Sequence, residues 1–373
     1  MRSGIYICFL LFGIQGCAKE GKPAMESTIE SGDLKGENKQ RKNDGENPKK
    51  NSGVSVGATP KSLKAFEHAP GKIQCIGLSS DGKTLAIGCE DGTVKLWDVE
   101  TGKVLATLNS EKKKVNSVAF SSDGKLIASG SSGNIVRIWE VPGGKEKAVF
   151  QDPKEPADIM SVAFMPDGKS ILGANYLGVV KEWDVETQKE RNKFWTVKQL
   201  ASIVLAPDGT FLAAGGASQI TDKPAPRVAL FKLPDGKPSE TILKHLSNVG
   251  ALAITRDGKL LAAGGGRLDE QPRTVNLWDV ATGNLMASLK GHKDSIIDSI
   301  HALAFSPDGK LLASVGVETR IWDVGTGREI AKINNSDFVR GISFGSDGKT
   351  LFSGLGNRVQ VWDLKPVLQS SEK

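Results

Sequence analysis

Short apolar stretches alternate with polar turns in a pattern that repeats seven times along the chain. Each unit reads as four strands, here called a to d; in the first unit they cover residues 73–78, 84–88, 93–98 and 104–108. Asp-Gly pairs separate strands a and b, and Thr-Gly pairs separate strands c and d in three units, because glycine adopts the positive φ that such turns need. The pattern predicts an all-β protein built from four-stranded antiparallel sheets.

Two landmarks set the period of the repeat. Asp-Gly begins at residues 81, 123, 167, 208, 257, 308 and 347. Strand c ends in tryptophan plus an acid in six units, at Trp97, Trp139, Trp183, Trp278, Trp322 and Trp362, and in Phe231-Lys232 in the fourth unit. These aromatic positions are 42, 44, 48, 47, 44 and 40 residues apart. A period of about 40 to 50 residues with short strands is typical of a propeller blade.

Strand a of every unit places a small residue beside a bulky one. The small column is Cys75, Ser117, Ser161, Ser202, Ala251, Ala302 and Gly341, and the bulky column is Ile76, Val118, Val162, Ile203, Leu252, Leu303 and Ile342. Because side chains alternate between the two faces of a strand, one face is small and the other is bulky. We expect the small face to let seven inner strands crowd around a propeller axis.

The seven units resemble the WD repeat, and the resemblance covers Ser62 to Leu364. It implies a seven-bladed β-propeller in which the six tryptophans are structural. The family's usual polar residues are sparse here: Gly-His before strand a is complete only at His292, the aspartate six residues before the tryptophan occurs only at Asp91, and the strand-b serine occurs at Ser129, Ser314 and Ser353. No unit holds the full Asp-His-Ser-Trp set, so we expect packing to supply most of the rigidity of a blade.

The two ends of the repeat region complement each other. The last unit stops after strand c at Leu364, and Pro366 follows, which has no amide donor. Residues 62–67 precede the first strand a and carry two apolar side chains, Leu63 and Phe66. We predict that this segment supplies the missing strand d by pairing with residues 358–363. Closure would remove two exposed sheet edges, which otherwise invite aggregation.

The chain starts with a segment typical of export. An apolar run of ten residues, Ile5 to Ile14, is too short to span a bilayer as a helix. Residues Ile14 to Cys17 resemble the lipobox of bacterial lipoprotein signal peptides, which implies cleavage after Gly16 and lipidation of Cys17. An ordinary secretory signal and a cytosolic protein with an apolar start are the alternatives.

A charged segment follows the signal-like region. Residues 18–60 contain eight lysines and arginines, seven acids and no aromatic residue. Such a composition cannot bury enough apolar surface to offset its ordering entropy, so we expect a disordered tether. The predicted domains are a lipoprotein-type signal peptide over 1–17, the tether over 18–60, the propeller over 61–366 and a disordered tail over 367–373.

Composition excludes several function classes. The formal charge of +6 comes from 49 basic and 43 acidic residues, too small an excess to predict nucleic-acid binding. Four histidines and four cysteines leave little material for a histidine-rich metal centre or a disulfide scaffold. We expect Cys75 and Cys89 to be diagonal neighbours and therefore free thiols.

Two sequence motifs suggest a binding site that other features of the sequence argue against. Residues 77–84 match the phosphate-loop pattern GxxxxGK[ST], but that loop needs a helix after it, and Thr84 opens a strand. His292 and His301 flank an insertion that contains Asp294 and Asp298, from which a metal site could be drawn. We favour a simpler interpretation, in which His292 is the ordinary Gly-His residue of the repeat and the two acids are solvated loop residues. We predict neither a metal nor a cofactor.

Two classes of function remain. The chain is either a non-catalytic protein-interaction scaffold or an enzyme on a propeller scaffold, such as a hydrolase, a lyase or a quinone-dependent dehydrogenase. The residues near the start of strand a are Gln74, Asn116, Met160, Ala201, Gly250, His301 and Arg340, a ring without a carboxylate. We therefore predict a scaffold rather than an enzyme. It would be a monomeric propeller, lipid-anchored in the bacterial cell envelope or else secreted.

The loops favour one end of the propeller for binding. The d–a and b–c connections emerge at what we call the first end, and the a–b and c–d turns at the second end. The long insertions, residues 216–226, 265–273 and 290–300, all belong to the first end. Trp195, outside the repeat pattern, also lies there. We predict that a protein or a glycan docks across blades three to six and contacts Trp195, Lys223, Arg227, Arg267, Asp269, Arg273 and His292. Alternatively, the loops are insertions that the surface tolerates without a function, and Trp195 packs against its own strand.

Overall fold

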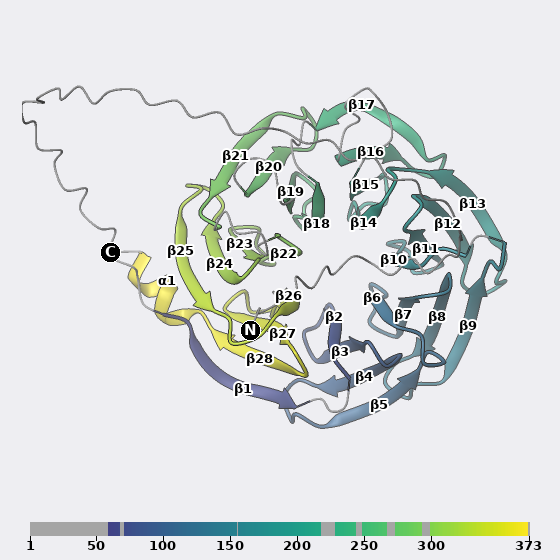
Figure 1. The fold of residues 1–373 in the computed structure, drawn as a ribbon, viewed down its shortest axis with the longest axis horizontal. Coiled ribbons are helices and arrows are strands. Elements are labelled where there is room, and N and C mark those ends of the chain that lie inside the picture. The colour runs from purple at the N-terminus through teal and green to yellow at the C-terminus, as the bar shows by residue number, and fades with distance from the viewer. Residues whose placement is uncertain are drawn as a thin grey trace, which may run out of the picture. The chain divides into compact units, whose positions relative to one another are not determined.

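A computed structural model describes residues 59–67, 71–154, 156–217, 228–243, 248–266, 273–292 and 299–371. These residues belong to one compact unit that begins at Val54. Their strands form seven antiparallel sheets of four strands each, arranged as blades around a common axis (Figure 1). The fold is therefore an all-β, seven-bladed propeller, as the repeat predicts.

Blades 1 to 6 follow the chain, each with strands a to d in order from the axis outward. Blade 1 is β2 (Ile73–Leu78), β3 (Thr84–Cys89), β4 (Thr93–Asp98) and β5 (Val104–Asn109). Blade 2 is β6 (Val115–Phe120), β7 (Leu126–Ser131), β8 (Ile135–Glu140) and β9 (Glu146–Gln151). Blade 3 is β10 (Ile159–Phe164), β11 (Ser170–Asn175), β12 (Val179–Asp184) and β13 (Glu190–Trp195).

The second half of the ring repeats the plan. Blade 4 is β14 (Leu200–Leu205), β15 (Phe211–Gly216), β16 (Val228–Lys232) and β17 (Lys237–Leu243). Blade 5 is β18 (Val249–Ile254), β19 (Leu260–Gly265), β20 (Thr274–Asp279) and β21 (Leu285–Lys290). Blade 6 is β22 (Ala302–Phe305), β23 (Leu311–Val315), β24 (Glu318–Asp323) and β25 (Glu329–Asn334).

Blade 7 combines the two ends of the propeller. Its strands a to c are β26 (Val339–Phe344), β27 (Thr350–Leu355) and β28 (Arg358–Asp363), and its strand d is β1 (Lys61–Glu67). The β1–β28 pair is antiparallel and runs from Lys61 opposite Asp363 to Glu67 opposite Arg358, with a shift of register between Ser62 and Lys64. The predicted closure is confirmed.

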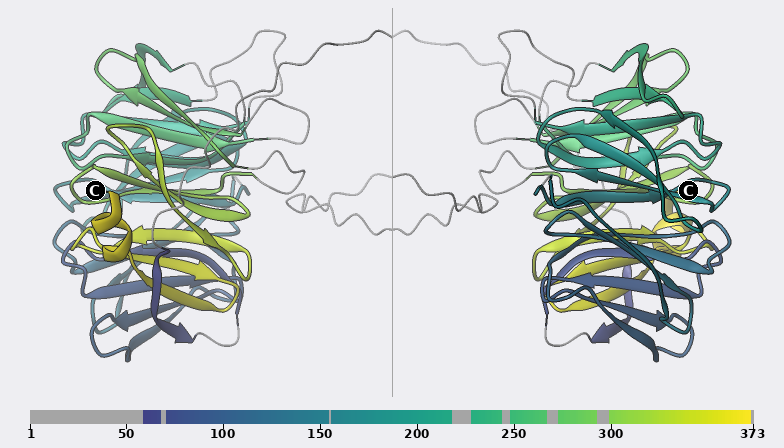
Figure 2. Two further views of the ribbon diagram at one scale, coloured as in Figure 1. Left: turned by 90° about the vertical axis from the view of Figure 1, so that its left-hand side faces the viewer. Right: turned by 90° about the vertical axis from the view of Figure 1, so that its right-hand side faces the viewer.

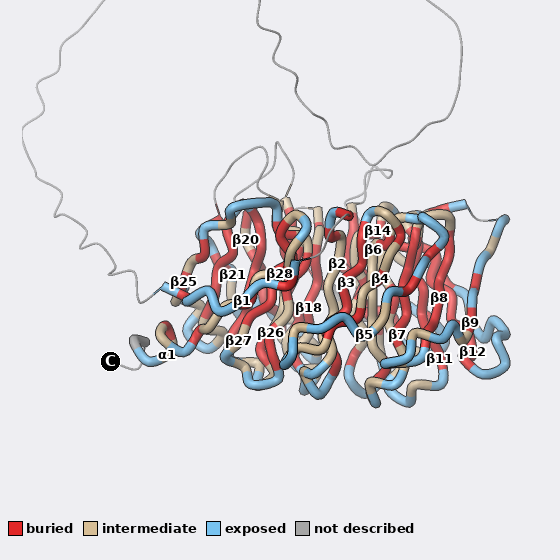
Figure 3. Tube along the Cα trace, turned by 90° about the horizontal axis from the view of Figure 1, so that it is seen from below, coloured by how far each residue is buried: buried red, intermediate tan, exposed pale blue. Residues whose placement is uncertain are grey.

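Small residues surround the axis because neighbouring backbones approach closely there. A Cβ on Gly250 would lie 2.5 Å from the carbonyl oxygen of Ile300, and one on Gly341 would lie 2.9 Å from the amide nitrogen of Ile76. Contacts this short leave no room for a side chain. The bulky column instead faces the space between blades. Figure 3 shows burial concentrated in the two middle strands of a blade, while much of the outer strand is exposed.

Each repeat tryptophan joins its blade to the preceding one. Trp139 of blade 2 packs in one cluster with Leu96 and Leu108 of blade 1, and Trp278 of blade 5 packs with Leu230 of blade 4. In the fourth blade, Phe231 takes this position and meets Phe194 of blade 3 at a ring separation of 6.2 Å. The tryptophans are structural, as the resemblance implies.

The C-terminal segment departs from the sequence prediction. Where we expected a disordered tail from residue 367, helix α1 (Lys365–Ser371) follows β28. Val367, only 1% exposed, and Leu368 pack with Leu364 against the core of blades 6 and 7. The apolar pair is too short to predict a helix alone, and it is stabilised by this tertiary contact. Figures 1 and 2 show the helix at the outer edge of the ring, beside β25.

Phe66 allows a direct test of ring closure. It is 2% exposed and packs edge-on against Trp97 of blade 1, with ring centroids 5.6 Å apart. We expect Phe66→Ala to lower the free energy of unfolding by about 3–5 kcal/mol, measured by urea denaturation. Leu63→Ala, on the same strand but 52% exposed, is the control and should change it by about 0.5 kcal/mol at most. Equal stability of the two variants would contradict closure as a stabilising contact.

Candidate interaction face

The second end of the ring uses its polar side chains to hold its own turns. Asp81 accepts hydrogen bonds from Ser79 Oγ at 2.6 Å and from the amide of Lys83 at 3.0 Å. The bond from Ser79 is the main reason that the pKa of Asp81 lies below its ordinary value. The same arrangement recurs at Asp123, Asp257 and Asp308. These carboxylates serve the a–b turns, so the second end offers a regular, internally satisfied surface.

The c–d turns of the second end follow a similar rule. Asp98 accepts bonds from both the amide and the hydroxyl of Thr101, at 2.6 and 2.7 Å. Asp279 does the same with Thr282, and Asp323 with Thr326. The chain enters and leaves the propeller beside these turns, because Lys61 lies opposite Asp363 at the end of β28.

The predicted contact residues fall into three groups in the structure. Lys223, Arg227, Arg267 and Asp269 lie outside the described residues, as does Cys17. Trp195, at the end of β13, is 60% exposed, and the ammonium of Lys193 lies 5.9 Å from its ring. Its indole is thus presented at the rim of blade 3.

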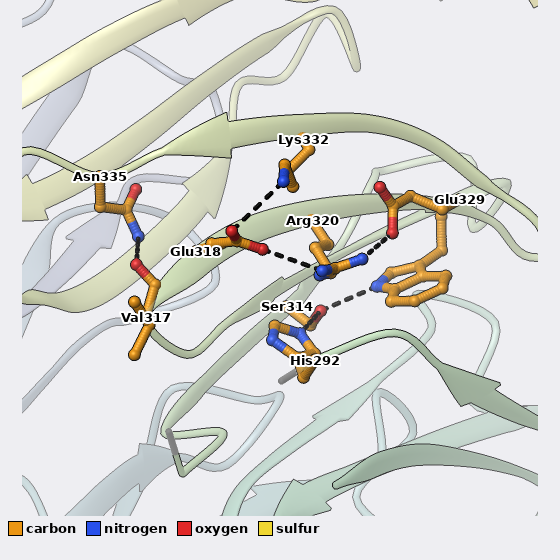
Figure 4. A network of polar contacts seen from close by, with 9 residues as sticks. His292, Ser314, Val317, Glu318, Arg320, Glu329, Lys332 and Asn335 are labelled. Atoms are coloured by element: carbon orange, nitrogen blue, oxygen red, sulfur yellow. Dashed lines mark hydrogen bonds and ion pairs between the residues drawn. The ribbon is translucent and has the colours of Figure 1, made fainter. Parts of the chain in front are cut away.

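Arg273 and His292 form the third group and correct the predicted contact set. Both are only 6% exposed, so neither offers its side chain to a partner. The ring of His292 is bonded through Nε2 to Ser314 Oγ at 2.7 Å, and Trp322 Nε1 donates to the same oxygen at 2.8 Å (Figure 4). Blade 6 therefore holds three of the four members of the family's polar network, and His292 stabilises the blade.

Buried ion pairs stiffen the same rim, and the sequence analysis missed them. Arg320 of β24 lies between Glu318, at 2.9 Å, and Glu329, and Lys332 also bonds to Glu318, at 3.2 Å (Figure 4). We call this group the blade 6 clamp. Since blades 2 and 3 repeat the motif, it is a recurring device; there the cations are Arg137, between Glu111 and Glu146, and Lys181, between Asp152 and Glu190.

A signal for these clamps exists in the sequence. The residue two positions before the strand-c tryptophan is Lys95, Arg137, Lys181, Asn276, Arg320 or Gln360. In blades 2, 3 and 6 this residue is buried although it is charged. A charged side chain inside an otherwise apolar strand predicts an acidic partner, since a buried charge is retained only when it is paired.

The axis contains a small polar cavity near the first end. Its volume is about 200 Å³, and its lining comprises Cys75, Ile76, Asn116, Ser117, Met160, Ser161, Ala201, Ser202, residues 250–252, residues 301–303 and residues 340–342. Six of the seven predicted ring positions belong to it, and Cys75 lines it in place of Gln74. No carboxylate is among these lining residues.

The described part of the chain offers little for redox or metal chemistry. Cys75 lies opposite Gly88 rather than Cys89, and both thiols are free, as expected. Burial raises the pKa of Cys89 to about 12, so the thiol stays protonated at neutral pH. Within the described ranges, no group of three histidine, cysteine or acidic side chains is arranged to hold a metal ion.

The segment that matches the phosphate-loop pattern, residues 77–84, forms a turn between two strands. Thr84 begins β3, and the preceding residues form the a–b turn that Ser79 and Asp81 bond. A strand in place of the required helix removes the N-terminal amides on which a phosphate would sit.

Comparisons with known proteins agree with this geometry. Over residues 109–349, more than half of the chain, the sequence matches the family described as the NWD2 C-terminal beta-propeller. Residues 63–118 match the WD40 domain of anaphase-promoting complex subunit 4.

Curated relatives match over shorter stretches. The small ribosomal subunit protein RACK1 of Caenorhabditis elegans is 31% identical over 127 residues, which cover 31% of this chain and 36% of that protein. RACK1y of Oryza sativa subsp. japonica is 30% identical over 98 residues, 26% of this chain and 28% of that protein. The WD repeat and SOCS box-containing protein 1 of Danio rerio is 33% identical over 96 residues, 24% and 22% of the two chains. The chain thus spans less than half the length of these relatives.

The blade 6 clamp can be tested by removing one acid without changing its shape. Glu318 is 9% exposed at its side chain, so Glu318→Gln leaves Arg320 without its buried counter-ion. We expect a loss of about 3 kcal/mol in the free energy of unfolding, read from urea denaturation. The control, Glu186→Gln, breaks the pair between Lys147 and a carboxylate that is 84% exposed, and should cost no more than about 1 kcal/mol. A small and equal effect of both substitutions would show that the clamp is not stabilising.

Proposed function

Because the chain belongs to the family of WD-repeat β-propellers, we propose that it is a non-catalytic protein-interaction scaffold that holds its partner at the first end. The proposal rests on where exposed apolar side chains lie. Among the described residues, four large ones are exposed at first-end loops or strand ends: Leu177, Trp195, Val317 and Phe338, which are 40 to 60% exposed. Exposed aromatic side chains on a rigid frame are favoured binding hot spots.

The frame beneath these side chains supports the same proposal. The blade 6 clamp joins the b–c loop, where Val317 lies, to β25, and Asn335 donates to the carbonyl oxygen of Val317 at 3.1 Å (Figure 4). At blade 3, Trp195 lies opposite Val179, and the amide of Thr196 donates to the carbonyl oxygen of Gly178, which fixes the end of β13 against the b–c turn. Preorganised contacts lose less entropy on binding than mobile ones.

We further propose that the protein is anchored by lipid at Cys17 in a bacterial cell envelope and displayed on a tether. Lys61, near the start of the described chain, lies at the second end, opposite Asp363. A tether that joins the propeller there would leave the first end free for a partner. Among the described helices, none has the length and apolarity needed to cross a membrane.

The interaction face is tested with a double variant. Leu177→Ser combined with Trp195→Ala removes two exposed groups, so stability should change by about 0.5 kcal/mol at most. Capture of a membrane partner by the immobilised full chain should weaken by about tenfold or more, because tryptophan is among the residues that most often dominate the binding energy of an interface. Met286→Ala, on the outer strand of blade 5 and 62% exposed, is the matched control. Unchanged capture by the double variant would place the partner elsewhere.

Substitution of Cys17 tests the proposed lipid anchor. Cys17→Ser removes the only sulfur that the lipobox offers for acylation. Cells expressing the variant should lose the palmitate label, because the acyl chains have no sulfur to attach to. The protein should then leave the membrane fraction, because the acyl chains supply the membrane affinity of a lipid-anchored protein. Cys89→Ser, within the propeller, should leave both readouts unchanged. Persistence of label in the Cys17 variant would refute lipidation at this residue.

A further inference from the structure

One position near the start of strand a bonds to the next blade in two parts of the ring. In blade 2 this position is Asn116, whose Nδ2 donates to the carbonyl oxygen of Ile159, the first residue of β10, at 2.9 Å. In blade 6 the same position is His301, whose Nε2 faces the carbonyl oxygen of Val339, the first residue of β26. The two contacts are therefore the same bond between neighbouring blades, made once by an amide and once by an imidazole.

Gly250 shows the same direction in blade 5. A Cβ on this glycine would lie 2.5 Å from the carbonyl oxygen of Ile300, which holds in blade 6 the place that Ile159 holds in blade 3. In blades 2, 5 and 6, the position thus faces a carbonyl oxygen of the following blade. Because a carbonyl oxygen accepts hydrogen bonds and never donates them, the side chain that meets it must be the donor.

The second nitrogen of the His301 ring also faces an acceptor. Nδ1 lies 2.7 Å from the carbonyl oxygen of Ser299. A neutral imidazole has one N–H group and one lone pair, whereas the imidazolium has two N–H groups. In the neutral ring, one nitrogen would set its lone pair against a carbonyl oxygen. The observed contacts are those of an imidazolium.

His301 joins segments from three blades at the first end. Its own amide donates to the carbonyl oxygen of Val315, in β23 of blade 6, at 3.0 Å. Ser299 belongs to the d–a connection that enters blade 6, and its hydroxyl donates to the carbonyl oxygen of Gly266 of blade 5 at 3.4 Å. Val339 starts blade 7. We call the contacts of the His301 ring with Ser299 and Val339 the blade 6–7 junction.

The stack beneath the ring favours the charged form. The ring of Phe338 lies parallel to the imidazole, with centroids 4.5 Å apart and an interplanar angle of 10°. An aromatic face attracts a cation, and turning the imidazole away from either carbonyl oxygen would break this stack. His301 is only partly buried, so its ring can exchange protons with water.

Few other charges surround the ring among the described residues. Arg340 of β26 lines the axial cavity together with His301, and its positive charge opposes a second proton on the imidazole. Cys75 of β2 lines the same cavity, and burial raises the pKa of its thiol, which is therefore uncharged. Asp337, before β26, accepts a bond from the amide of Phe338 at 2.7 Å. Strands β18, β22 and β23 carry no ionisable side chain.

We propose that the blade 6–7 junction depends on one proton: the imidazolium of His301 donates to both Ser299 and Val339, and the neutral ring releases one of them. The bond to Val339 should be the one that is kept, because Asn116 makes its counterpart in blade 2 with an amide that does not titrate. The inference goes beyond the proposed function and does not rest on it.

The sign of the pH dependence follows from the acceptors. Two carbonyl oxygens stabilise the charged ring in the folded chain, whereas water surrounds it in the unfolded chain. The stabilisation is therefore present at acidic pH and is lost as the pH rises through the titration of His301 in the folded state.

The protonation of His301 can be measured directly by NMR. The full chain contains four histidines, so labelling with carbon-13 at Cε1 gives few signals, and His301→Asn identifies the one that belongs to His301. We expect His301 to titrate at least about one pH unit above the ordinary histidine pKa of about 6.5. Arg340→Gln should raise the titration further, because it removes a nearby positive charge. Lys125→Gln, at the second end and with its side chain 80% exposed, is the control and should leave it unchanged.

Thermal unfolding of the full chain shows whether this proton holds the junction. Between about pH 6 and about pH 8.5, the unfolding temperature of the wild type should fall by about 2 °C or more beyond the change seen in His301→Asn. The asparagine keeps a donor for Val339, as Asn116 does for Ile159, and it carries no titrating proton. His301→Gln gives the same comparison with a longer amide, and the other histidines contribute equally to all three proteins.

Two results would overturn the inference. One is a His301 signal that titrates at or below about pH 6.5, because the two carbonyl oxygens would then give the charged ring no advantage. The other is an equal change of unfolding temperature with pH in the wild type and both amide variants, which would show that the proton does not hold the junction. Neither measurement involves a partner, so the proposed function is judged separately by capture.

Discussion

Strand β1 completes a blade whose other three strands come from the far end of the repeat region. Gln360 Nε2 donates to Ser62 Oγ across this pair, at 2.8 Å, although the two residues are 298 positions apart in sequence. In an open repeat array each unit meets only its neighbours, and the terminal units lack one. Here the β1–β28 pair makes blade 7 a neighbour of blade 1. The cluster that contains Phe66, Phe352 and Trp97 is complete only in the closed ring.

Closure also explains why the two ends of the ring differ. Blades 1 to 6 turn twice at the second end and blade 7 turns once, and the aspartates there are bonded to the turns themselves. The d–a and b–c connections at the first end are free to lengthen, because they run over the surface. The charged clamps at Arg137, Lys181 and Arg320 then fix the rim from which these connections start.

Sequence alone predicted the parts of the structure that depend on local pattern. Turn chemistry and strand alternation gave the blades, and the unused segment at 62–67 gave the closure that the β1–β28 register confirms. The fate of polar side chains was harder to predict. His292 belongs to the repeat pattern, yet it was assigned to the partner surface, and its burial against Ser314 depends on how β23 and β24 pack.

The inner ring shows the same limit. Arg340 belongs to the predicted ring of residues near the start of strand a, but the contact of its guanidinium with the ring of Phe338 depends on the fold. Helix α1 was missed for a related reason, because Val367 becomes helical only where blades 6 and 7 offer it a contact.

The distribution of charge separates what folding requires from what it does not. In the blade 6 clamp each cation has an acid, so the arrangement stabilises the blade and needs no ligand. Arg340 is held differently, since its guanidinium lies 5.0 Å from the ring of Phe338, and that ring stacks on the imidazole of His301. The charged clamps therefore belong to the stability of the blades, whereas the exposed apolar side chains at the first end, such as Trp195 and Phe338, are groups that folding leaves at the surface. Large apolar side chains that remain exposed on a rigid frame are typical of binding surfaces.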